Sequence, residues 1–168
     1  MLYFVRHGQT EFNATNLYMG SLDLPLNELG IVQVETLAQR IFKLDLHLIV
    51  SSDLLRARQT ADIINKALNV PIFISESLRE RSLGSLEGKT KNQTIDIEKF
   101  HDIEDYFKFK DRVLKTIFTL GEISRCLNIL IVSHSHVFKI LTKCENLVLE
   151  KERLANCEYS SVRFVSST

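Results

Sequence analysis

Residues 2–8 read LYFVRHG, and this stretch decides the fold. The apolar run Leu2–Val5 is rich in strand-forming side chains, so it predicts a short buried strand at the start of the chain. Arg6 and His7 follow the carboxyl end of that strand, which is where open α/β sheets bind their ligands. A histidine beside an arginine at this place indicates a nucleophile or a base next to an anion-binding group. The alternative interpretation is a strand that ends in two polar residues and a turn glycine.

Beyond this strand, helix and strand patterns alternate along the chain. Apolar residues at helical spacing predict helices over residues 27–44, 52–68, 102–124 and 136–144. Asn27 and Ser52 are the expected N-terminal caps of the first two. Further strands are predicted over residues 46–50, 71–74, 128–132 and 159–165. Residues 76–93 lack sustained periodicity and are expected to form a loop, and residues 95–101 show no clear preference.

Strands that alternate with helices in this way predict one fold class. We expect a single-domain α/β fold, a three-layer sandwich with a mostly parallel sheet and helices on both faces, spanning residues 1–168. A chain of 168 residues is long enough to bury a sizeable core within one domain. No repeat, low-complexity stretch or linker divides it.

The composition argues against several classes of partner. The formal net charge is zero and no block of Lys and Arg is present, so neither nucleic acid nor a membrane surface is expected. No apolar run is long enough to span a bilayer, and the first strand begins without a signal-peptide pattern. The three cysteines, Cys126, Cys144 and Cys157, lie far apart without a CxxC motif. We expect them to be reduced thiols that act as small buried apolar side chains in a cytoplasmic protein.

Two later segments place more anion-binding groups at strand ends. Arg56 stands in the first turn of the second predicted helix, where free backbone N–H groups also favour anions. Its planar guanidinium suits a phosphoryl group, because it binds two oxygens at once. His134 follows a predicted strand and precedes a helix, so its imidazole and the N–H of Ser135 are both expected to face an anion. Alternatively, Arg56 lies on a solvated helix face and His134 is a hydrogen-bonded histidine that ends a strand.

Four motifs match one known family in its own order. They are Arg-His-Gly-x-Thr-x-x-Asn over residues 6–13, Ser-x-x-x-x-Arg-Ala-x-x-Thr-Ala over 51–61, Leu-x-Glu with Gly-x-x-Glu-Gly over 78–88, and Ser-His at 133–134. Together they resemble the histidine phosphatase superfamily, which includes cofactor-dependent phosphoglycerate mutases and many small phosphatases. The resemblance extends from Leu2 to the last predicted strand near Val165. It implies a phosphoglycerate mutase-like form of the predicted fold.

The resemblance implies distinct catalytic roles. His7 attacks phosphorus to give a phosphohistidine, and His134 assists by holding a phosphoryl oxygen. Glu80 protonates the leaving alcohol and then activates water against the phosphohistidine. To act as an acid near neutral pH, Glu80 needs a raised pKa, through partial burial or neighbouring negative charge. A solvated charge run over residues 79–81 is the alternative interpretation, and Glu87 is then the next candidate.

The resemblance also implies a set of phosphate-binding groups. They are Arg6, Asn13, Arg56 and His134, with Thr10 and Ser135 as additional candidates. These groups neutralise a phosphoryl group by themselves, so neither a metal ion nor another cofactor is expected. The family usually has glycine after the second histidine, whereas this chain has Ser135 followed by His136. A side chain must therefore fit beside the site, and His136 is an alternative to His134 or a further lining residue.

Chain length separates the members of this family. The mutases carry inserted segments that cover the site, whereas here only residues 90–111 leave room for a lid. We therefore expect a phosphatase that hydrolyses small-molecule phosphomonoesters through a phosphohistidine on His7. Residues 18–26 are similar to a segment of α-ribazole phosphatases of cobalamin synthesis, which favours that substrate among small phosphorylated metabolites.

Three other functions remain open at this point. The first is phosphoryl transfer of the phosphoglycerate mutase type. The second is a non-catalytic protein that binds phosphorylated ligands, although the filled reactive positions argue against it. The third is a metal hydrolase, for which residues 134–136 form the only suggestive histidine cluster. The sequence does not predict the oligomeric state, and a homodimer is one option.

Overall fold

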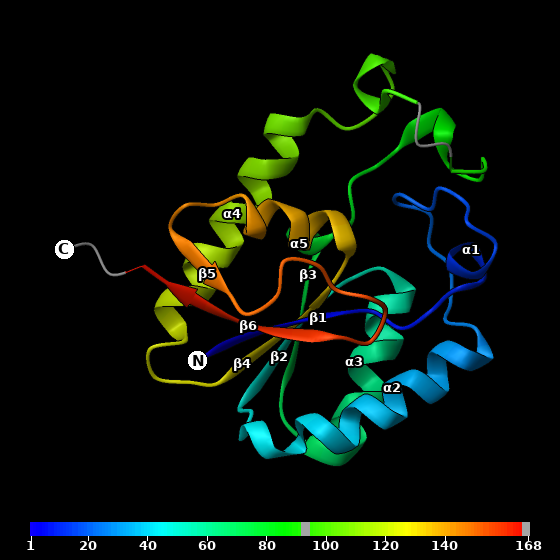
Figure 1. Cartoon of the computed structure of the whole chain (residues 1–168). Coiled ribbons are helices and arrows are strands. Elements are labelled where there is room, and N and C mark those ends of the chain that lie inside the picture. The colour runs from blue at the N-terminus through cyan, green and yellow to red at the C-terminus, as the bar shows by residue number, and fades with distance from the viewer. Residues whose placement is uncertain (92–94, 166–168) are drawn as a thin grey trace.

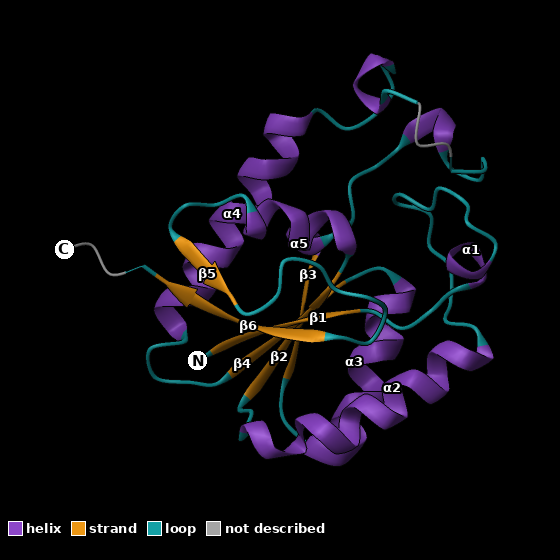
Figure 2. Ribbon diagram, viewed as in Figure 1, coloured by secondary structure: helices purple, strands orange, loops and turns teal. Residues whose placement is uncertain are grey.

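The computed structural model describes residues 1–91 and 95–165 and contains a six-stranded sheet in the order β3-β2-β4-β1-β6-β5 (Figure 1, Figure 2). The strands are β1 (Leu2–Arg6), β2 (Leu48–Ser52), β3 (Ile72–Ser75), β4 (Ile129–Ser133), β5 (Leu147–Leu149) and β6 (Tyr159–Phe164). The neighbours β3, β2, β4 and β1 run parallel, and β6 and β5 extend the sheet antiparallel at one edge. The prediction of a mostly parallel sheet is confirmed.

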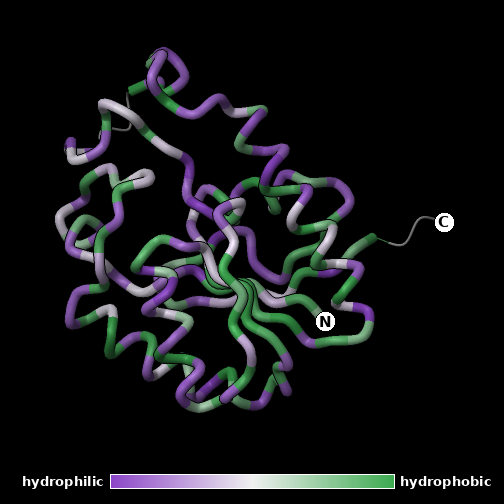
Figure 3. The backbone as a smooth tube through the Cα atoms, turned by 180° about the vertical axis from the view of Figure 1, so that it is seen from behind, coloured by the Kyte–Doolittle hydropathy of each residue, from purple (hydrophilic) through white to green (hydrophobic). Residues whose placement is uncertain are grey.

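Helices cover both faces of the sheet, which confirms the predicted three-layer architecture (Figure 1). The long helices are α2 (Glu28–Ile41), α3 (Leu55–Leu68), α4 (Tyr106–Ile123) and α5 (Ser135–Thr142). Successive strand residues point to opposite faces, so each face has its own apolar core. In β1, for example, Phe4 packs with residues of α4 and α5, whereas Val5 packs with residues of α2 and α3. The central strands are accordingly the most continuously hydrophobic part of the chain (Figure 3).

Parallel pairing aligns the carboxyl ends of the strands. Arg6 is in register with Ser133 across β1 and β4, and Ser51 is in register with Val132 across β2 and β4. The segments that follow β1, β2 and β4 therefore leave the sheet at one edge. This is the place where a parallel sheet collects polar groups from distant parts of a sequence.

One of the two predicted helix caps is confirmed and the other is wrong. Asn27 caps α2, because its side-chain oxygen accepts a hydrogen bond from Gly30 N at 2.8 Å. Ser52 does not cap α3, which begins at Leu55 with Leu54 as its cap residue and no side-chain capping bond. The Ser52 hydroxyl instead contacts a histidine, as described below.

The sequence patterns missed the shortest elements. A single turn of helix, α1 (Glu11–Ala14), and the three-residue strand β5 are both too short to show a period. α4 begins at Tyr106 rather than at residue 102, because Asp105 accepts a hydrogen bond from Lys108 N at 2.9 Å and caps it. Short 3-10 helices are Phe42–Leu44, Glu76–Leu78, Gly84–Leu86 and Ile97–Lys99.

The region between β3 and α4 is mostly loop, as predicted for residues 76–91; the predicted end of this loop at Gln93 lies outside the described residues. A small apolar cluster ties this region together, with Leu83, Leu86 and Ile103 buried at its centre. The segment 95–103 thus packs on the turn at 83–86. A lid role for residues 90–111 stays a prediction, and residues 92–94 of that segment are also outside the description.

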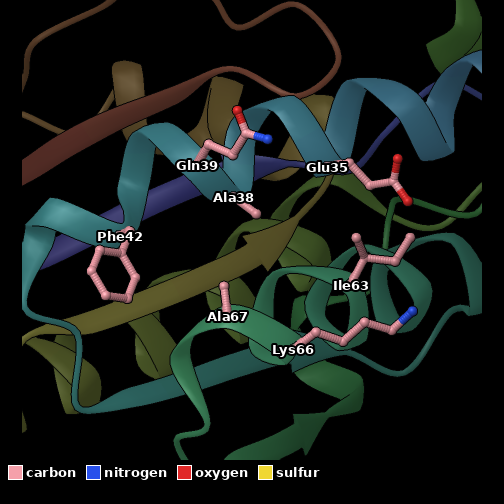
Figure 4. A pocket seen from close by; sticks show the side chains of 7 residues that line it. All are labelled: Glu35, Ala38, Gln39, Phe42, Ile63, Lys66 and Ala67. Carbon is pink, nitrogen blue, oxygen red and sulfur yellow. The ribbon is translucent and has the colours of Figure 1, made fainter.

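An apolar groove of about 540 Å³ lies between α2 and α3 (Figure 4). Its lining residues are Glu35, Ala38, Gln39, Phe42, Ile63, Lys66 and Ala67. None of them belongs to the segments that meet at the carboxyl edge of the sheet. The groove is therefore separate from the polar groups that the sequence singles out.

The expectation that the cysteines are reduced and buried is confirmed only in part. All three are free thiols, and Cys157 is buried, whereas Cys126 is exposed. Burial raises the pKa of the Cys157 thiol to about 12, which keeps it protonated and unreactive. Among the described residues, no helix has the length and apolar character needed to cross a membrane.

Helix α2 crosses the loop after β1 at unusually short range. A Cβ atom at Gly8 would lie 2.8 Å from Gly30 O, and a Cβ atom at Gly30 would overlap the backbone of Gln9. Gln9 O also accepts a hydrogen bond from Asn27 N at 3.0 Å. The start of α2 therefore fixes the backbone that carries His7.

Replacement of Gly30 by alanine tests this contact. Alanine favours a helix by about 1 kcal/mol over glycine. We expect Gly30→Ala to destabilise the protein nevertheless, by about 1–3 kcal/mol, because backbone must move to admit the methyl group. Val32→Ala on the same helix, at a residue 56% exposed, serves as the control and should change stability little. Urea unfolding measures both, and a Gly30→Ala protein as stable as the parent would contradict the close contact.

Candidate active site

A pocket of about 240 Å³ opens where the carboxyl ends of the strands meet. Its lining residues are Arg6, His7, Asn13, Tyr18, Met19, Gly20, Arg56, Glu80, Leu83, Lys91, Ser135, His136 and Lys139. Most of the predicted site residues are in this set. His134 is fully buried beside it, with its ring centroid 5.1 Å from that of His7, and Thr10 is also buried and does not line the pocket.

His7 has one ring nitrogen engaged and the other available. Its Nδ1 lies 2.7 Å from Gly8 O, and because a carbonyl oxygen only accepts, Nδ1 carries the proton. Nε2 is then the unprotonated nitrogen. Burial, with the positive charges of Arg56 and Arg6, lowers the pKa of His7 well below its usual value. The imidazole is neutral near pH 7, which is the form that can attack an electrophile.

His134 is oriented by a residue that the sequence did not assign to the site. Its Nε2 lies 2.9 Å from Ser52 Oγ at the end of β2. The hydroxyl group expected to cap α3 therefore fixes this imidazole instead. Burial, followed by the charge of Arg56, lowers the pKa of His134 well below its usual value, so this ring is also neutral in the free pocket.

Arg56 reaches the pocket from the first turn of α3, as predicted, and it is 1% exposed. Its Nη1 donates to Leu22 O at 2.6 Å and its Nη2 donates to Gly20 O at 2.9 Å. Gly20 presents its carbonyl group from a backbone with φ +52°, a conformation that favours glycine. Burial lowers the pKa of Arg56 to about 10, so the guanidinium stays charged near neutral pH.

The threonine of the same motif connects α3 with the loop after β1. Gly8 N donates to Thr60 Oγ1 at 3.1 Å, and Thr60 Oγ1 donates to Arg56 O at 2.7 Å. One hydroxyl group thus links the backbone beside His7 to the backbone of Arg56. This explains why the spacing from Arg56 to Thr60, one helical turn, matters for the site.

Four buried side-chain nitrogens have no hydrogen-bond partner within residues 1–91 and 95–165. They are Arg6 Nε, Arg56 Nε, His134 Nδ1 and His136 Nδ1, of which the last lies 3.3 Å from Glu80 Oε1 without hydrogen-bond geometry. Buried polar groups in folded proteins are nearly always paired, so a cluster of unpaired ones calls for an explanation. All four belong to residues that line this pocket or adjoin it. An oxyanion is the ligand that several converging N–H donors and two arginines favour.

Among the residues that the structure describes, Glu80 is the only carboxylate that lines the pocket. It is 7% exposed and accepts hydrogen bonds from Arg81 N at 3.1 Å, from His136 N at 3.2 Å and from Ser135 Oγ at 3.2 Å. Burial raises the pKa of Glu80, but the charge and hydrogen bonds of His136 outweigh this effect and hold the pKa well below its usual value. The expectation of a raised pKa is therefore wrong for the free pocket, where Glu80 is ionised.

The residues beside Glu80 do not form a solvated charge run. Arg79 forms an ion pair with Asp53, and the buried Arg81 forms one with Glu98 at 2.6 Å. Each arginine is thus directed to its own carboxylate. The Glu80 side chain, which pairs with neither arginine, lines the pocket.

Asn13 and Thr10 act together, but only Asn13 lines the pocket. Thr10 caps α1, with its hydroxyl group within 3.3 Å of Asn13 N and 3.2 Å of Asn13 Oδ1. Asn156, which the sequence patterns missed, donates from Nδ2 to His7 O at 2.9 Å and to Asn13 Oδ1 at 3.3 Å. Since Asn13 Oδ1 is engaged, the amide nitrogen is the group that Asn13 offers to a ligand. No local pattern marks Asn156, which lies in the loop before β6.

Glu87, the alternative to Glu80, supports the pocket from outside. Its Oε1 accepts from Ser21 N at 2.8 Å and from Leu83 N at 2.9 Å. It does not line the pocket. Its bonds hold the loop whose carbonyl groups bind Arg56.

Lys91 and Lys139 are lining residues without any sequence signal. Lys91 N donates to Asn16 O at 2.9 Å, which holds this segment against the loop after α1. Lys139 stands one turn beyond His136 on α5. Both add positive charge to a pocket that already holds two arginines.

The described residues offer no set of metal ligands that would support the metal-hydrolase alternative. Within the described ranges, no group of three or more His, Cys, Asp and Glu side chains is arranged to hold a metal ion. In the cluster at 134–136, His134 contacts Ser52 and His136 contacts Glu80. Metal independence itself stays a prediction.

Comparisons with known proteins identify the family of this chain. A family model described as the histidine phosphatase superfamily (branch 1) matches residues 2–167. The uncharacterised phosphatase PhoE of Bacillus subtilis is 30% identical over 168 aligned positions, which cover 95% of this chain and 86% of that protein. The solved structure of YhfR from Bacillus stearothermophilus is 30% identical, with a TM-score of 0.76 over 83% of this chain and 76% of that chain.

A solved structure from Escherichia coli, described as a candidate alpha-ribazole-5'-P phosphatase, is also similar. It has a TM-score of 0.78 and covers 99% of this chain and 95% of that chain, at 24% identity. At this level of identity the likeness shows the fold and not the substrate.

Substitution of two arginines on α3 tests the anion site. Arg56→Lys keeps a positive charge but loses the planar donor set, so we expect orthophosphate or vanadate to bind about 10- to 100-fold more weakly. Arg58→Lys, at an exposed position of α3, is the matched control and should bind like the parent. Calorimetric titration, and the rise of each variant's own melting temperature on adding the anion, give the affinities. Equal loss in both variants, or in neither, would exclude Arg56 as an anion ligand.

Proposed function

The chain belongs to branch 1 of the histidine phosphatase superfamily, and we propose that it is a phosphatase that hydrolyses small-molecule phosphomonoesters through a phosphohistidine on His7. The observation that carries this proposal is the cluster of buried, unpaired donor nitrogens around His7 and Arg56. A phosphoryl dianion accepts hydrogen bonds from these nitrogens and offsets the buried positive charge of the two arginines. Its phosphorus atom is then held beside the free nitrogen of His7.

The proposed first step is attack by His7 Nε2 on phosphorus. The bond from Nδ1 to Gly8 O fixes the tautomer, and the lowered pKa keeps the ring unprotonated. Arg6, Arg56 and His134 hold the phosphoryl oxygens and stabilise the charge that develops during transfer. Because the two guanidinium groups neutralise the phosphoryl charge, we propose that no metal ion takes part.

Glu80 is proposed to serve both as acid and as base. In the free pocket it is ionised, which suits it to take a proton from the water that attacks the phosphohistidine. When a phosphoryl dianion enters, it adds negative charge near Glu80, and this raises the pKa of the carboxyl group. The substrate itself thus promotes the protonated form that the leaving oxygen requires.

Hydrolysis rather than mutase transfer fits the small amount of chain available to cover the site. A mutase must keep water from its phosphohistidine while the substrate reorients. Residues 90–111 are predicted to offer such a cover, and residues 95–103 of this segment pack on the turn at 83–86. Phosphate release measured across a panel of phosphomonoesters, α-ribazole phosphate among them, identifies the preferred substrate.

Trapping the intermediate tests the proposed function. Rapid quench with a nitrophenyl phosphate should yield an acid-labile, base-stable phosphoenzyme, the behaviour of phosphohistidine. His7→Ala should lose the phosphoenzyme and at least about 10³-fold in turnover, since the covalent route is gone. The exposed His101 lies outside the pocket, so His101→Gln is the control and should behave like the parent.

The same assay separates the competing functions. A phosphoenzyme on serine, or no phosphate release from any ester, would reject the proposal and favour a non-catalytic phospho-ligand-binding protein. Isomer exchange of 2- and 3-phosphoglycerate with negligible phosphate release would favour a mutase. Activity that disappears with a chelator and returns with zinc, magnesium or manganese would reject the metal-free mechanism.

The role of Glu80 predicts a dependence on the leaving group. Glu80→Gln should slow the phosphorylation burst with alkyl phosphates by about 10²-fold, and with nitrophenyl phosphate by much less, because nitrophenolate leaves without a proton. Glu35→Gln, in the groove between α2 and α3, is the control. An equal loss for both kinds of substrate would assign Glu80 a purely structural role.

A further inference from the structure

The pair of Glu80 and His136 has a geometry that phosphate binding alone does not explain. His136 Nδ1 lies 3.3 Å from Glu80 Oε1, and the same carboxylate accepts a hydrogen bond from His136 N at 3.2 Å. Among the described residues, this imidazole is the only side chain in an ion-pair contact with Glu80. One hydrogen bond and one close ion-pair contact from the same residue therefore hold the carboxylate of the acid and base group.

The two ends of the His136 ring lie in different surroundings. Nδ1 is buried beside Glu80 Oε1, whereas the side chain as a whole is 29% exposed. His136 also lines the pocket. The ring thus connects a buried carboxylate with solvent, and imidazole exchanges protons readily near neutral pH because it has two nitrogens.

We infer that His136 is a positioning residue that relays protons between solvent and Glu80, an inference that rests on the proposed phosphatase function. Ser135 Oγ, 3.2 Å from Glu80 Oε2, completes the arrangement by holding the second carboxylate oxygen. Oε1 then faces the imidazole. Glu80 exchanges the proton with the substrate, and His136 acts only through Glu80.

The proton balance of the relay closes over one turnover. In the first step His7 Nε2 bonds to phosphorus and the ester P–O bond breaks. The leaving oxygen takes a proton that the His136 imidazolium passes through Glu80, so that His136 becomes neutral and Glu80 is ionised again. In the second step water bonds to phosphorus, the P–N bond breaks with its electron pair returning to His7, and the water proton passes through Glu80 back to His136.

Several charged groups face this part of the pocket and influence protonation of the relay. They are Arg6, Arg56, Glu80, Lys91, Glu98 and Lys139. Glu98 reaches it from the segment 97–99, and Lys139 reaches it from the same helix as His136. The carboxylates attract positive charge and the cationic groups repel it, so both sides of the pocket influence proton transfer there.

Burst kinetics as a function of pH test the relay. In the parent protein, phosphorylation by an alkyl phosphate should slow as the pH rises, because the relay supplies a proton from His136. In His136→Gln this limb should move at least about one pH unit toward acid, because Glu80 must then hold its own proton. At pH 7 the alkyl phosphate burst should fall about 10- to 100-fold, while the nitrophenyl phosphate burst changes less than about threefold.

Two further measurements separate a relay from simple support of Glu80. Added imidazole should restore the alkyl phosphate burst of His136→Gly, and His101→Gln should match the parent throughout. Equal loss with both substrates, an unmoved pH limb or no rescue by imidazole would overturn the relay. If the relay fails but every variant still forms phosphoenzyme from nitrophenyl phosphate, the proposed phosphatase function stands. If the parent protein forms no phosphoenzyme, the phosphatase function itself is rejected.

Discussion

The site depends on a single hydroxyl group, that of Thr60. It accepts from Gly8 N and donates to Arg56 O, so it joins the backbone after β1 to the first turn of α3. The nucleophile and the main anion-binding side chain come from segments that the chain separates by about fifty residues, and this short link sets their spacing. The close contact of Gly8 with Gly30 restrains the same backbone from the side of α2. Rigid placement of this kind is what phosphoryl transfer requires, because misplacement by 1 Å is costly.

The pocket concentrates groups that are unfavourable to bury. Arg56 is almost fully buried, and among the described residues its guanidinium is bonded to carbonyl groups and to no carboxylate. Two neutral histidines and an ionised Glu80 lie close by. Such a site lowers the stability of the fold, and the two apolar cores on either side of the sheet compensate for it.

The sequence predicted the parts of this molecule that follow from long-range periodicity and from motif order. The parallel sheet, the helices on both faces and the cap at Asn27 arise from patterns extending over many residues or from one strong local bond. Ser52 was misassigned because a serine just before a helix satisfies the pattern of a cap, whereas tertiary contact gives its hydroxyl group to His134. Asn156 and Lys91 reach the pocket from loops, where no pattern reports proximity. The pKa of Glu80 escaped prediction because it depends on a neighbour fifty-six positions away.

The lowered pKa values of His134 and Glu80 make the binding of a phosphoryl dianion depend on pH. An arriving dianion favours protonation of His134 by attraction and of Glu80 by repulsion, so ligand and proton enter the pocket together. Each then strengthens the binding of the other by the same factor, as reciprocity requires. The apparent affinity for a phosphoryl dianion therefore increases as the pH falls, until the ligand itself becomes protonated. The heat of binding accordingly includes the ionisation of the buffer that supplies the proton.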